Sequence, residues 1–342
     1  MMEVKHFAIH IDNTHLPKAA LKIIKNIRLD WKAEDVRFKV FTDGITNKLI
    51  GCYCLNDPDD IMLVRVYGEK TDLFIDRLVE VQNFKLMSSK GYAPKLFATF
   101  DNGMVYSYIP GDVLNVTSCK DASIYPLVAT MLAKMHKLSY DSNVPKIPLV
   151  WDKCKCFIDL IPDQYSSTDK QLRFSKNFPG GKSFLKEELE ELKRTLENVS
   201  NPVVFCHNDL LLANIIHRNN SVTFIDYEYA GYNYQAFDIA NHFAEFAGVS
   251  EFDCTLYPSE EFQLDWLRKY LKEYSENGVS FSEERLNQLY LDVCRFFPIA
   301  HFLWSMWSLV QLHHSFIDFD YLEYAVQRFQ EYKKFKKNIY YA

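Results

Sequence analysis

The sequence lacks several features that mark whole classes of protein. Only 11 glycines and 12 prolines occur in 342 residues, which excludes a collagen-like or linker-like chain. Basic residues are not in excess, since 39 Lys and Arg stand against 45 Asp and Glu, and this balance argues against a nucleic-acid binder. Hydrophobic residues make up 48% of the chain, which is enough for a large core and excludes wholesale disorder.

Targeting and membrane-spanning signals are also missing from the sequence. Residues 1–6 are mixed polar, without the apolar stretch of a secretory signal. The longest apolar run, 296–310, is shorter than the ~20 residues that span a bilayer, so we interpret it as a buried helix. The eight cysteines show neither a disulfide pattern nor a zinc-ligand spacing, and we expect reduced thiols in a cytoplasmic protein without a transmembrane segment.

The first third of the sequence has the pattern of a sheet with one helix. Alternating apolar and polar residues predict strands at 36–42 and 49–55, joined by a turn at Asp43 and Gly44. The elements expected next are a turn at 56–60, a strand at 61–67, a helix at 73–88 and strands at 95–100 and 104–109. The segment therefore predicts a five-stranded antiparallel sheet with one helix.

After Pro110 and Gly111 the pattern becomes helical, and we place a boundary there between residues 1–110 and 111–342. Apolar periodicity predicts helices at 124–138, 183–198, 260–276, 281–313 and 318–335. A β-rich island at 203–225 interrupts them. Another helix is expected at 18–27, in a segment that otherwise has no clear pattern.

The β-rich island carries residues suited to phosphoryl transfer. Two predicted strands are each followed by a carboxylate: the first by His207, Asp209 and Asn214 in the pattern His-x-Asp-x-x-x-x-Asn, the second by Asp226. Phosphoryl transfer requires a carboxylate at the attacking hydroxyl and oxygen ligands for magnesium, and protein kinases use the same Asp-to-Asn spacing. We predict a phosphotransferase site; the alternative is a structural β-hairpin with a buried His and a capping Asp.

Longer stretches around these residues resemble the choline/ethanolamine kinase family. They are Ile-Asp-Tyr-Glu-Tyr-Ala-Gly-Tyr-Asn-Tyr at 225–234, Phe-Asp-Ile-Ala-Asn-His-Phe-Ala-Glu at 237–245, Phe-Thr-Asp-Gly-Ile-Thr-Asn-Lys-Leu at 41–49, Val-Arg-Val-Tyr-Gly at 64–68 and His-Phe-Leu-Trp-Ser-Met-Trp at 301–307. The resemblance implies an α+β, protein-kinase-like fold of two lobes, with a nucleotide-binding lobe at 1–110 and a catalytic and substrate-binding lobe at 111–342. It also implies an enzyme that uses ATP and Mg²⁺ to phosphorylate an amino alcohol.

The resemblance implies roles for individual residues. Asp209 would be the catalytic base, and Asn214 and Asp226 would hold magnesium. The residues implied for ATP are Thr46 and Asn47 in a phosphate loop, Arg65 where protein kinases place a phosphate-binding Lys, Glu80 as its ion-pair partner, and Ile109 near adenine. His207 and Asp238 are interpreted as structural residues that position the loop. Because the multi-Gly loop, Asp-Phe-Gly and Ala-Pro-Glu motifs of protein kinases are missing, protein substrates are not expected.

The identity of the amino alcohol depends on the residues that face its cationic end. A primary ammonium is best bound by carboxylates and a quaternary one by aromatic rings, and Glu245 is the anionic candidate. Trp304 and Trp307, on one helix face, and Tyr324 are the expected pocket walls; the alternative is an ordinary core-facing stripe. Only Phe246 and small residues follow Glu245, where choline-preferring members are expected to place Trp and Tyr.

This incomplete aromatic cage, together with the resemblance of 42–53 and 246–249 to the ethanolamine kinase branch, favours ethanolamine. We therefore expect ATP and ethanolamine as substrates, in the first step of the CDP-ethanolamine route to phosphatidylethanolamine. The alternatives are a choline or dual-specificity kinase, an antibiotic-type phosphotransferase that shares the loop, and a catalytically inactive nucleotide-binding scaffold. Nucleic acid is not an expected partner, and a homodimer is left open.

Overall fold

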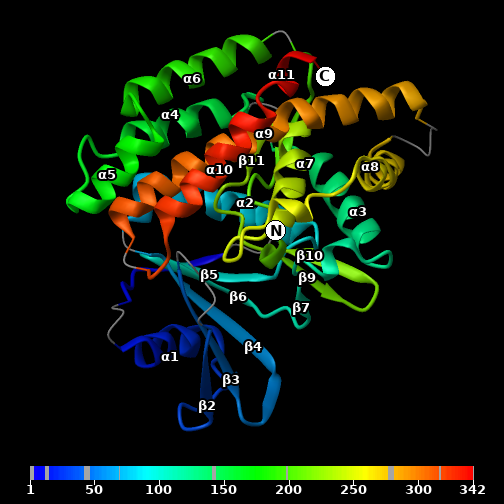
Figure 1. Ribbon diagram of the computed structural model, residues 1–342. Coiled ribbons are helices and arrows are strands. Elements are labelled where there is room, and N and C mark those ends of the chain that lie inside the picture. Colours follow the sequence, from blue (N-terminus) through cyan, green and yellow to red (C-terminus); the bar gives the residue numbers. More distant parts are fainter. Residues whose placement is uncertain are drawn as a thin grey trace. The chain divides into compact units, whose positions relative to one another are not determined.

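The computed structural model describes residues 4–11, 15–41, 47–68, 70–140, 144–197, 199–275, 281–315 and 317–341. Within it the chain forms two units, Met1–Gly111 and Asp112–Ala342 (Figure 1). The first unit is built on a sheet, and the second consists mainly of helices and also contains two small sheets.

Six strands form the sheet of the first unit, counted over the residues that the structure describes. Their order is β1-β5-β6-β4-β3-β2, and their bounds are Lys5–Phe7 (β1), Val36–Phe41 (β2), Lys48–Cys54 (β3), Asp57–Val66 (β4), Leu96–Phe100 (β5) and Gly103–Ser107 (β6). Neighbouring strands are antiparallel except β1, which pairs parallel to β5. The predicted five-stranded antiparallel sheet thus lacked β1, because three residues are too few to show an alternating pattern.

The turn predicted at 56–60 is wrong. Strand β4 begins at Asp57, and Asp57 pairs with Cys54 of β3, so that only Leu55 and Asn56 form the connection. The exposed acidic side chains at this end of β4 resemble a loop in the sequence. Backbone pairing continues through them, since ladder hydrogen bonds use main-chain groups that every residue except proline supplies in full.

Two helices of the first unit pack on its sheet. Helix α1 (Leu16–Ile27) buries Ala20, Ile23 and Ile24, whose helical spacing directs one apolar face into the core shared with β3 and β4. Helix α2 (Arg77–Ser89) begins four residues later than the predicted start at 73, after a short 3₁₀ turn (η2, Thr71–Leu73). The Asp76 carboxylate caps α2 by accepting hydrogen bonds from two backbone N–H groups of its first turn, a contribution of about 1 kcal/mol.

The small sheets of the second unit carry the loops of the candidate site. Strand β8 (Val203–Cys206) pairs antiparallel to β11 (Gly231–Tyr234). Strand β9 (Ile215–Arg218) lies between β10 (Ser221–Phe224) and β7 (Asp112–Val113). The two strands predicted in the β-rich island are thus present as β8 and β10, in separate sheets.

Helices make up most of the second unit. Their bounds are Tyr125–His136 (α3), Val150–Leu160 (α4), Thr168–Asn177 (α5), Gly181–Leu196 (α6), Gln235–Ala244 (α7), Glu260–Tyr274 (α8), Glu283–His314 (α9), Tyr321–Phe335 (α10) and Asn338–Tyr341 (α11). The five helices predicted here are present with ends shifted by up to three residues, whereas α4, α5, α7 and α11 were not predicted. Helix α9 packs against α4, α7, α8 and α10 (Figure 1).

Helix α9 contains the longest apolar run of the sequence. Among the described residues it is the one helix long and apolar enough to cross a membrane, and 78% of its most apolar stretch is buried inside the protein. The interpretation of 296–310 as a buried helix is confirmed, because neighbouring helices rather than lipid cover this surface.

Candidate active site

The loop that follows β8 presents Asp209 in a fixed backbone conformation. Asn208 has a φ of 65°, in the left-handed region that asparagine tolerates better than most residues. Its Nδ2 donates to the carbonyl oxygen of Tyr229 at 2.9 Å, and its Oδ1 accepts from Nδ2 of Asn233 at 2.8 Å. Hydrogen bonds from the neighbouring strand and turn therefore hold the residue that directs Asp209.

One face of α7 binds the same loop from the other side. The Asp238 carboxylate accepts hydrogen bonds from the backbone N–H groups of His207 and Asn208, at 2.8 and 2.7 Å. Asn241 donates to the carbonyl oxygen of Asn208, and Nδ1 of His242 donates to a further carbonyl oxygen of the loop. Positions three and four apart share a helix face, so a single face of α7 determines where the loop lies.

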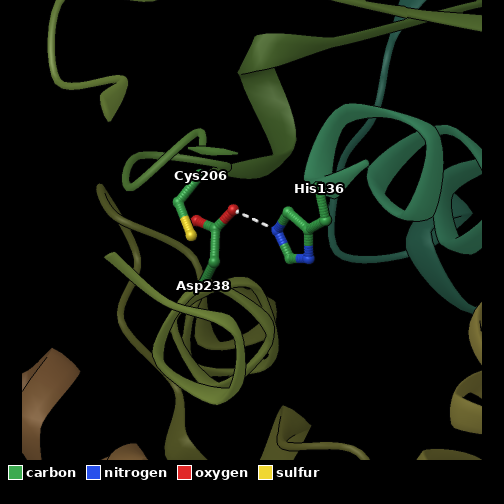
Figure 2. A group of neighbouring side chains, drawn as sticks. All are labelled: His136, Cys206 and Asp238. Carbon is green, nitrogen blue, oxygen red and sulfur yellow. Dashed lines mark hydrogen bonds and ion pairs between the residues drawn. The ribbon is translucent and has the colours of Figure 1, made fainter. Parts of the chain in front are cut away.

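Asp238 also contacts the side chains of His136 and Cys206, as Figure 2 shows. Nε2 of His136 lies 2.9 Å from the Asp238 carboxylate, and Nδ1 of His136 lies 2.6 Å from the Tyr270 hydroxyl. These residue types can bind metals, but hydrogen bonds already occupy the carboxylate and both imidazole nitrogens. Burial and the charge of Asp238 raise the pKa of the Cys206 thiol well above its ordinary value. The cluster is therefore accounted for as a buried hydrogen-bond network, in agreement with the structural role predicted for Asp238.

Buried histidines, two of them at this loop and one on α9, make the folded state sensitive to acid. Burial lowers the pKa of His242 to about 4, and it lowers those of His207 and His301 as well. The unfolded chain binds these protons at about pH 6.5, so acid favours unfolding. Stability that is complete above pH 6.5 should fall as the pH drops towards 4, by up to about 1.4 kcal/mol per pH unit for each histidine.

Urea unfolding between pH 7 and 5 measures this effect, with His242→Asn as the matched variant. Asparagine keeps an N–H donor for the loop carbonyl but has no titratable group, so the variant should lose less stability across this range than the parent protein. Equal pH dependence of the two proteins would contradict the role of His242.

A second loop, after β10, is joined to the Asp209 loop. Nε2 of His207 donates to the carbonyl oxygen of Ile225 at 3.0 Å, directly before Asp226. Nδ2 of Asn214 donates to the backbone oxygen of Asp209 at 2.9 Å and lies 3.4 Å from its carboxylate. Asp226 has a φ of 64°, a second left-handed position at this site. The structure thus brings together the three residues predicted to carry the chemistry.

The site concentrates negative charge. Burial, followed by the charges of Asp226, Glu245 and Glu228, raises the pKa of the Asp209 carboxyl well above its ordinary value. Carboxylate oxygens of Asp226 and Glu228 lie within 4.8 Å of each other. Glu228 was not predicted from the sequence, although it lies only two residues after Asp226. Such a group of carboxylates favours the binding of cations.

The oxygen atoms available at this site fit magnesium. Asn214 uses its Nδ2 for the hydrogen bonds to Asp209, and its Oδ1 accepts none from the described part of the chain. Together with the carboxylate of Asp226, this oxygen supplies the hard ligands that Mg²⁺ prefers, and it leaves the remaining positions to phosphate oxygens and water.

The two predicted tryptophans of α9 bond Asn241 and Tyr229, two residues that in turn contact the Asp209 loop. Nε1 of Trp304 donates to Oδ1 of Asn241 at 2.6 Å, and Nε1 of Trp307 donates to the hydroxyl of Tyr229 at 3.0 Å. The rings of Trp304 and Tyr229 meet edge to face, with centroids 5.5 Å apart. Both tryptophans are buried, and their contacts connect α9 to the loop through Asn241 and Tyr229. Their role as substrate-pocket walls stays a prediction.

Glu245 lies in a 3₁₀ turn (η5, Glu245–Ala247) directly after α7 and has a partner that the sequence did not reveal. Its Oε1 accepts a hydrogen bond from Nη2 of Arg328 at 2.9 Å. The Arg328 guanidinium lies 5.6 Å from the ring centroid of Tyr324 and 5.8 Å from that of Phe252. The sequence feature that could have pointed to Arg328 is its helical spacing from a predicted pocket residue. Arg328 follows Tyr324 by four residues, so both lie on one face of α10.

In the first unit, the ion pair expected between Arg65 and Glu80 is present. Nη1 of Arg65 on β4 lies 3.1 Å from Oε1 of Glu80 on α2, and the Glu80 side chain is fully buried. Arg77, which was not predicted, binds the second carboxylate oxygen at 2.7 Å. The sequence feature that could have predicted this contact is spacing, because Arg77 lies three residues before Glu80 on one helix. The approach of Arg65 to ATP stays a prediction.

The other residues predicted to contact ATP lie at the ends of strands. Asn47 is half-buried directly before β3, and Ile109 is half-buried two residues after the end of β6. Thr46 lies outside the described residues. Their contacts with ATP stay predictions.

Comparisons of the sequence with family models and with curated proteins match one family over most of the chain. The family model described as Choline/ethanolamine kinase matches residues 38–333. Ethanolamine kinase 2 of Rattus norvegicus is 45% identical over 335 residues, which cover 97% of this chain and 85% of the relative. Ethanolamine kinase 1 of Homo sapiens is 43% identical over 328 residues, covering 94% of this chain and 72% of the relative.

Among solved structures, that of the ethanolamine kinase of Plasmodium vivax superposes with a TM-score of 0.83. It is 28% identical, and the match covers 96% of this chain and 92% of that one. The α+β, protein-kinase-like fold class predicted from the sequence is thereby confirmed.

Proposed function

The chain belongs to the choline/ethanolamine kinase family, and from this membership we propose that it transfers the γ-phosphoryl group of ATP to the hydroxyl oxygen of ethanolamine. The observation that carries the choice of substrate is the 45% identity, over 97% of the chain, to a relative named ethanolamine kinase. The products are phosphoethanolamine and ADP, and the reaction is the first step of the CDP-ethanolamine route to phosphatidylethanolamine. We propose the cytoplasm as its location.

Asp209 is proposed as the catalytic base. Phosphoryl transfer depends mainly on positioning and on electrostatic stabilisation of a loose transition state. The Asp209 carboxylate orients the substrate hydroxyl and takes its proton, while the new oxygen–phosphorus bond forms and the bond to the leaving ADP oxygen breaks. The contacts from α7 and from Asn208 support this assignment, because they hold the loop in one position before substrate binds.

The negative charge around Asp209 is proposed to be balanced by the reactants. When bound, Mg²⁺ neutralises charge on the ATP phosphates. Oδ1 of Asn214 and the carboxylate of Asp226 would hold it, with Glu228 beside Asp226. The carboxylate of Glu245 would bind the ammonium of ethanolamine, and Trp304, Trp307 and Tyr324 would form the walls around it.

Residues 1–110 are proposed as the nucleotide-binding lobe and 111–342 as the catalytic and substrate-binding lobe. Arg65 would bind the phosphates of ATP, and Glu80 would orient Arg65 through their ion pair. Thr46 and Asn47 would contact the phosphates, and Ile109 the adenine. The buried position of Glu80 between Arg65 and Arg77 supports a fixed orientation of the Arg65 guanidinium.

Kinetics with two alcohols test the proposed substrate. With ATP and Mg²⁺, kcat/KM for ethanolamine should exceed that for choline by at least about tenfold, because carboxylates bind a primary ammonium through N–H donors that choline lacks. A value for choline equal to or above that for ethanolamine would instead support a choline or dual-specificity kinase.

Two further measurements test the remaining alternatives. Activity assays with a panel of aminoglycosides test the antibiotic-type alternative, and light scattering of the same sample tests the homodimer hypothesis.

A further inference from the structure

The ion pair between Arg328 and Glu245 differs from an ordinary stabilising contact. The Arg328 side chain is fully buried, and Glu245 is 4% exposed. Among the described residues, only Nη2 of Arg328 forms a hydrogen bond, and both Nε and Nη1 have none. A buried pair with so few hydrogen bonds recovers little of its desolvation penalty, so stability alone gives no good reason for it.

The geometry of the pair leaves one carboxylate oxygen for another donor. Arginine often binds a carboxylate through two parallel hydrogen bonds, which occupy both oxygens. Here Arg328 bonds only Oε1 of Glu245, at 2.9 Å, and no donor in the described part of the chain bonds Oε2. The pair therefore fixes the carboxylate at one oxygen, and the other accepts no hydrogen bond from the residues that the structure describes.

Aromatic packing fixes the position of the guanidinium. It lies 5.6 Å from the ring centroid of Tyr324 and 5.8 Å from that of Phe252, and these two rings meet edge to face. Cation–π attraction and close packing restrict the rotamers of a long side chain that would otherwise be mobile. The Glu245 carboxylate is thus held by a partner that cannot readily move.

Helix α7 connects Glu245 to the Asp209 loop. Glu245 follows Asn241 by four residues, about one helical turn, and Asn241 bonds the backbone oxygen of Asn208, next to Asp209. Only two carbons separate the hydroxyl and the ammonium of ethanolamine. The two carboxylates that bind these ends must therefore lie close together, which is possible where α7 connects them.

We propose that Arg328 is a positioning residue for substrate binding: by holding Oε1 of Glu245 it directs Oε2 towards the ammonium of the amino alcohol. This inference rests on the proposed function, since it assigns Arg328 a part in recognising that substrate. Arg328 itself touches no reacting atom, and it acts through Glu245.

Variants of the pair test the proposal by the KM of each substrate. Arg328→Met, which keeps the length but removes the charge, should raise the ethanolamine KM at least about tenfold and leave the ATP KM within about twofold. Arg328→Lys should restore part of the loss, because it supplies a cation of different geometry. Glu245→Gln should raise the ethanolamine KM similarly, and adding Arg328→Met to it should cause little further increase, since coupled residues are not additive.

The matched control is Arg268→Met, which removes an exposed arginine paired with Glu283 and should change neither KM. Melting temperatures show whether each variant folds. If Arg328→Met does not fold, the ethanolamine KM of Arg328→Lys tests the proposal in its place. An unchanged or lower ethanolamine KM in a folded Arg328 variant overturns the proposal, as does an equal rise in both KM values. Absence of ethanolamine phosphorylation by the unmodified protein overturns the proposed function instead, so the two failures are distinguishable.

Discussion

Replacement of Asp209 by Ala should lower kcat by a factor of about 10³, because general-base catalysis by a positioned carboxylate contributes about 10²–10⁴. ATP binding should persist, since the proposed base acts on the alcohol rather than on the nucleotide. Steady-state kinetics with ethanolamine measure kcat, and titration calorimetry measures ATP binding. Substantial residual turnover in the folded variant would refute the role of Asp209.

The same position should show opposite effects on activity and on stability. Burial and three neighbouring carboxylates raise the pKa of Asp209, which means that the folded chain disfavours its charge at neutral pH. Asp209→Asn removes this repulsion while keeping the shape, so the protein without ligands should gain in melting temperature as it loses activity. A lower melting temperature would indicate that Asp209 stabilises the fold through contacts other than those seen here.

Replacement of Asp238 by Ala should destabilise the protein by about 3 kcal/mol or more, because it leaves buried donors without an acceptor, each at a cost of about 1–3 kcal/mol. These donors are the backbone N–H groups of His207 and Asn208 and Nε2 of His136. Denaturant unfolding measures the loss. Because the same bonds position the Asp209 loop, kcat per folded molecule should fall as well.

A matched control for Asp238 is Asp121→Ala, at an exposed aspartate whose side chain, among the described residues, bonds only Ser123. It should change stability by about 1 kcal/mol or less and leave kcat unchanged. If Asp238→Ala does not fold, His136→Asn, which removes one of the donors, tests the same network more mildly. Parent-like stability and kcat in a folded Asp238→Ala variant would contradict the role of α7 as the support of the loop.

Local patterns were sufficient for much of the fold. Alternation located β2 and β3, and apolar periodicity located α6, α8, α9 and α10, because one face of each element packs on a core. Strand β1 could not be predicted in this way, since its three residues gain their structure by pairing with β5, more than 90 residues later. Helices α4, α5, α7 and α11 were missed as well, and the start of β4 was placed too late.

Spacing was sufficient to select Asp209, Asn214 and Asp226, which the structure brings together. The signals for Glu228, Tyr229 and Arg77 were present in the sequence, at short spacings from residues already selected. Nothing in the sequence alone distinguished these spacings from the many that occur by chance on any strand or helix.

The sequence by itself determined the N-terminal strands, most of the later helices, the kinase-like loop and the net acidity, because these depend on residue type and on local spacing, and its resemblance to a known family implied the fold class. Only the tertiary structure decided which side chains support the site. Trp304 bonds Asn241, 63 residues away, and Arg328 binds Glu245, 83 residues away. Such hydrogen bonds require atoms within about 3 Å of each other, and the packing of α7, α9 and α10 sets those distances.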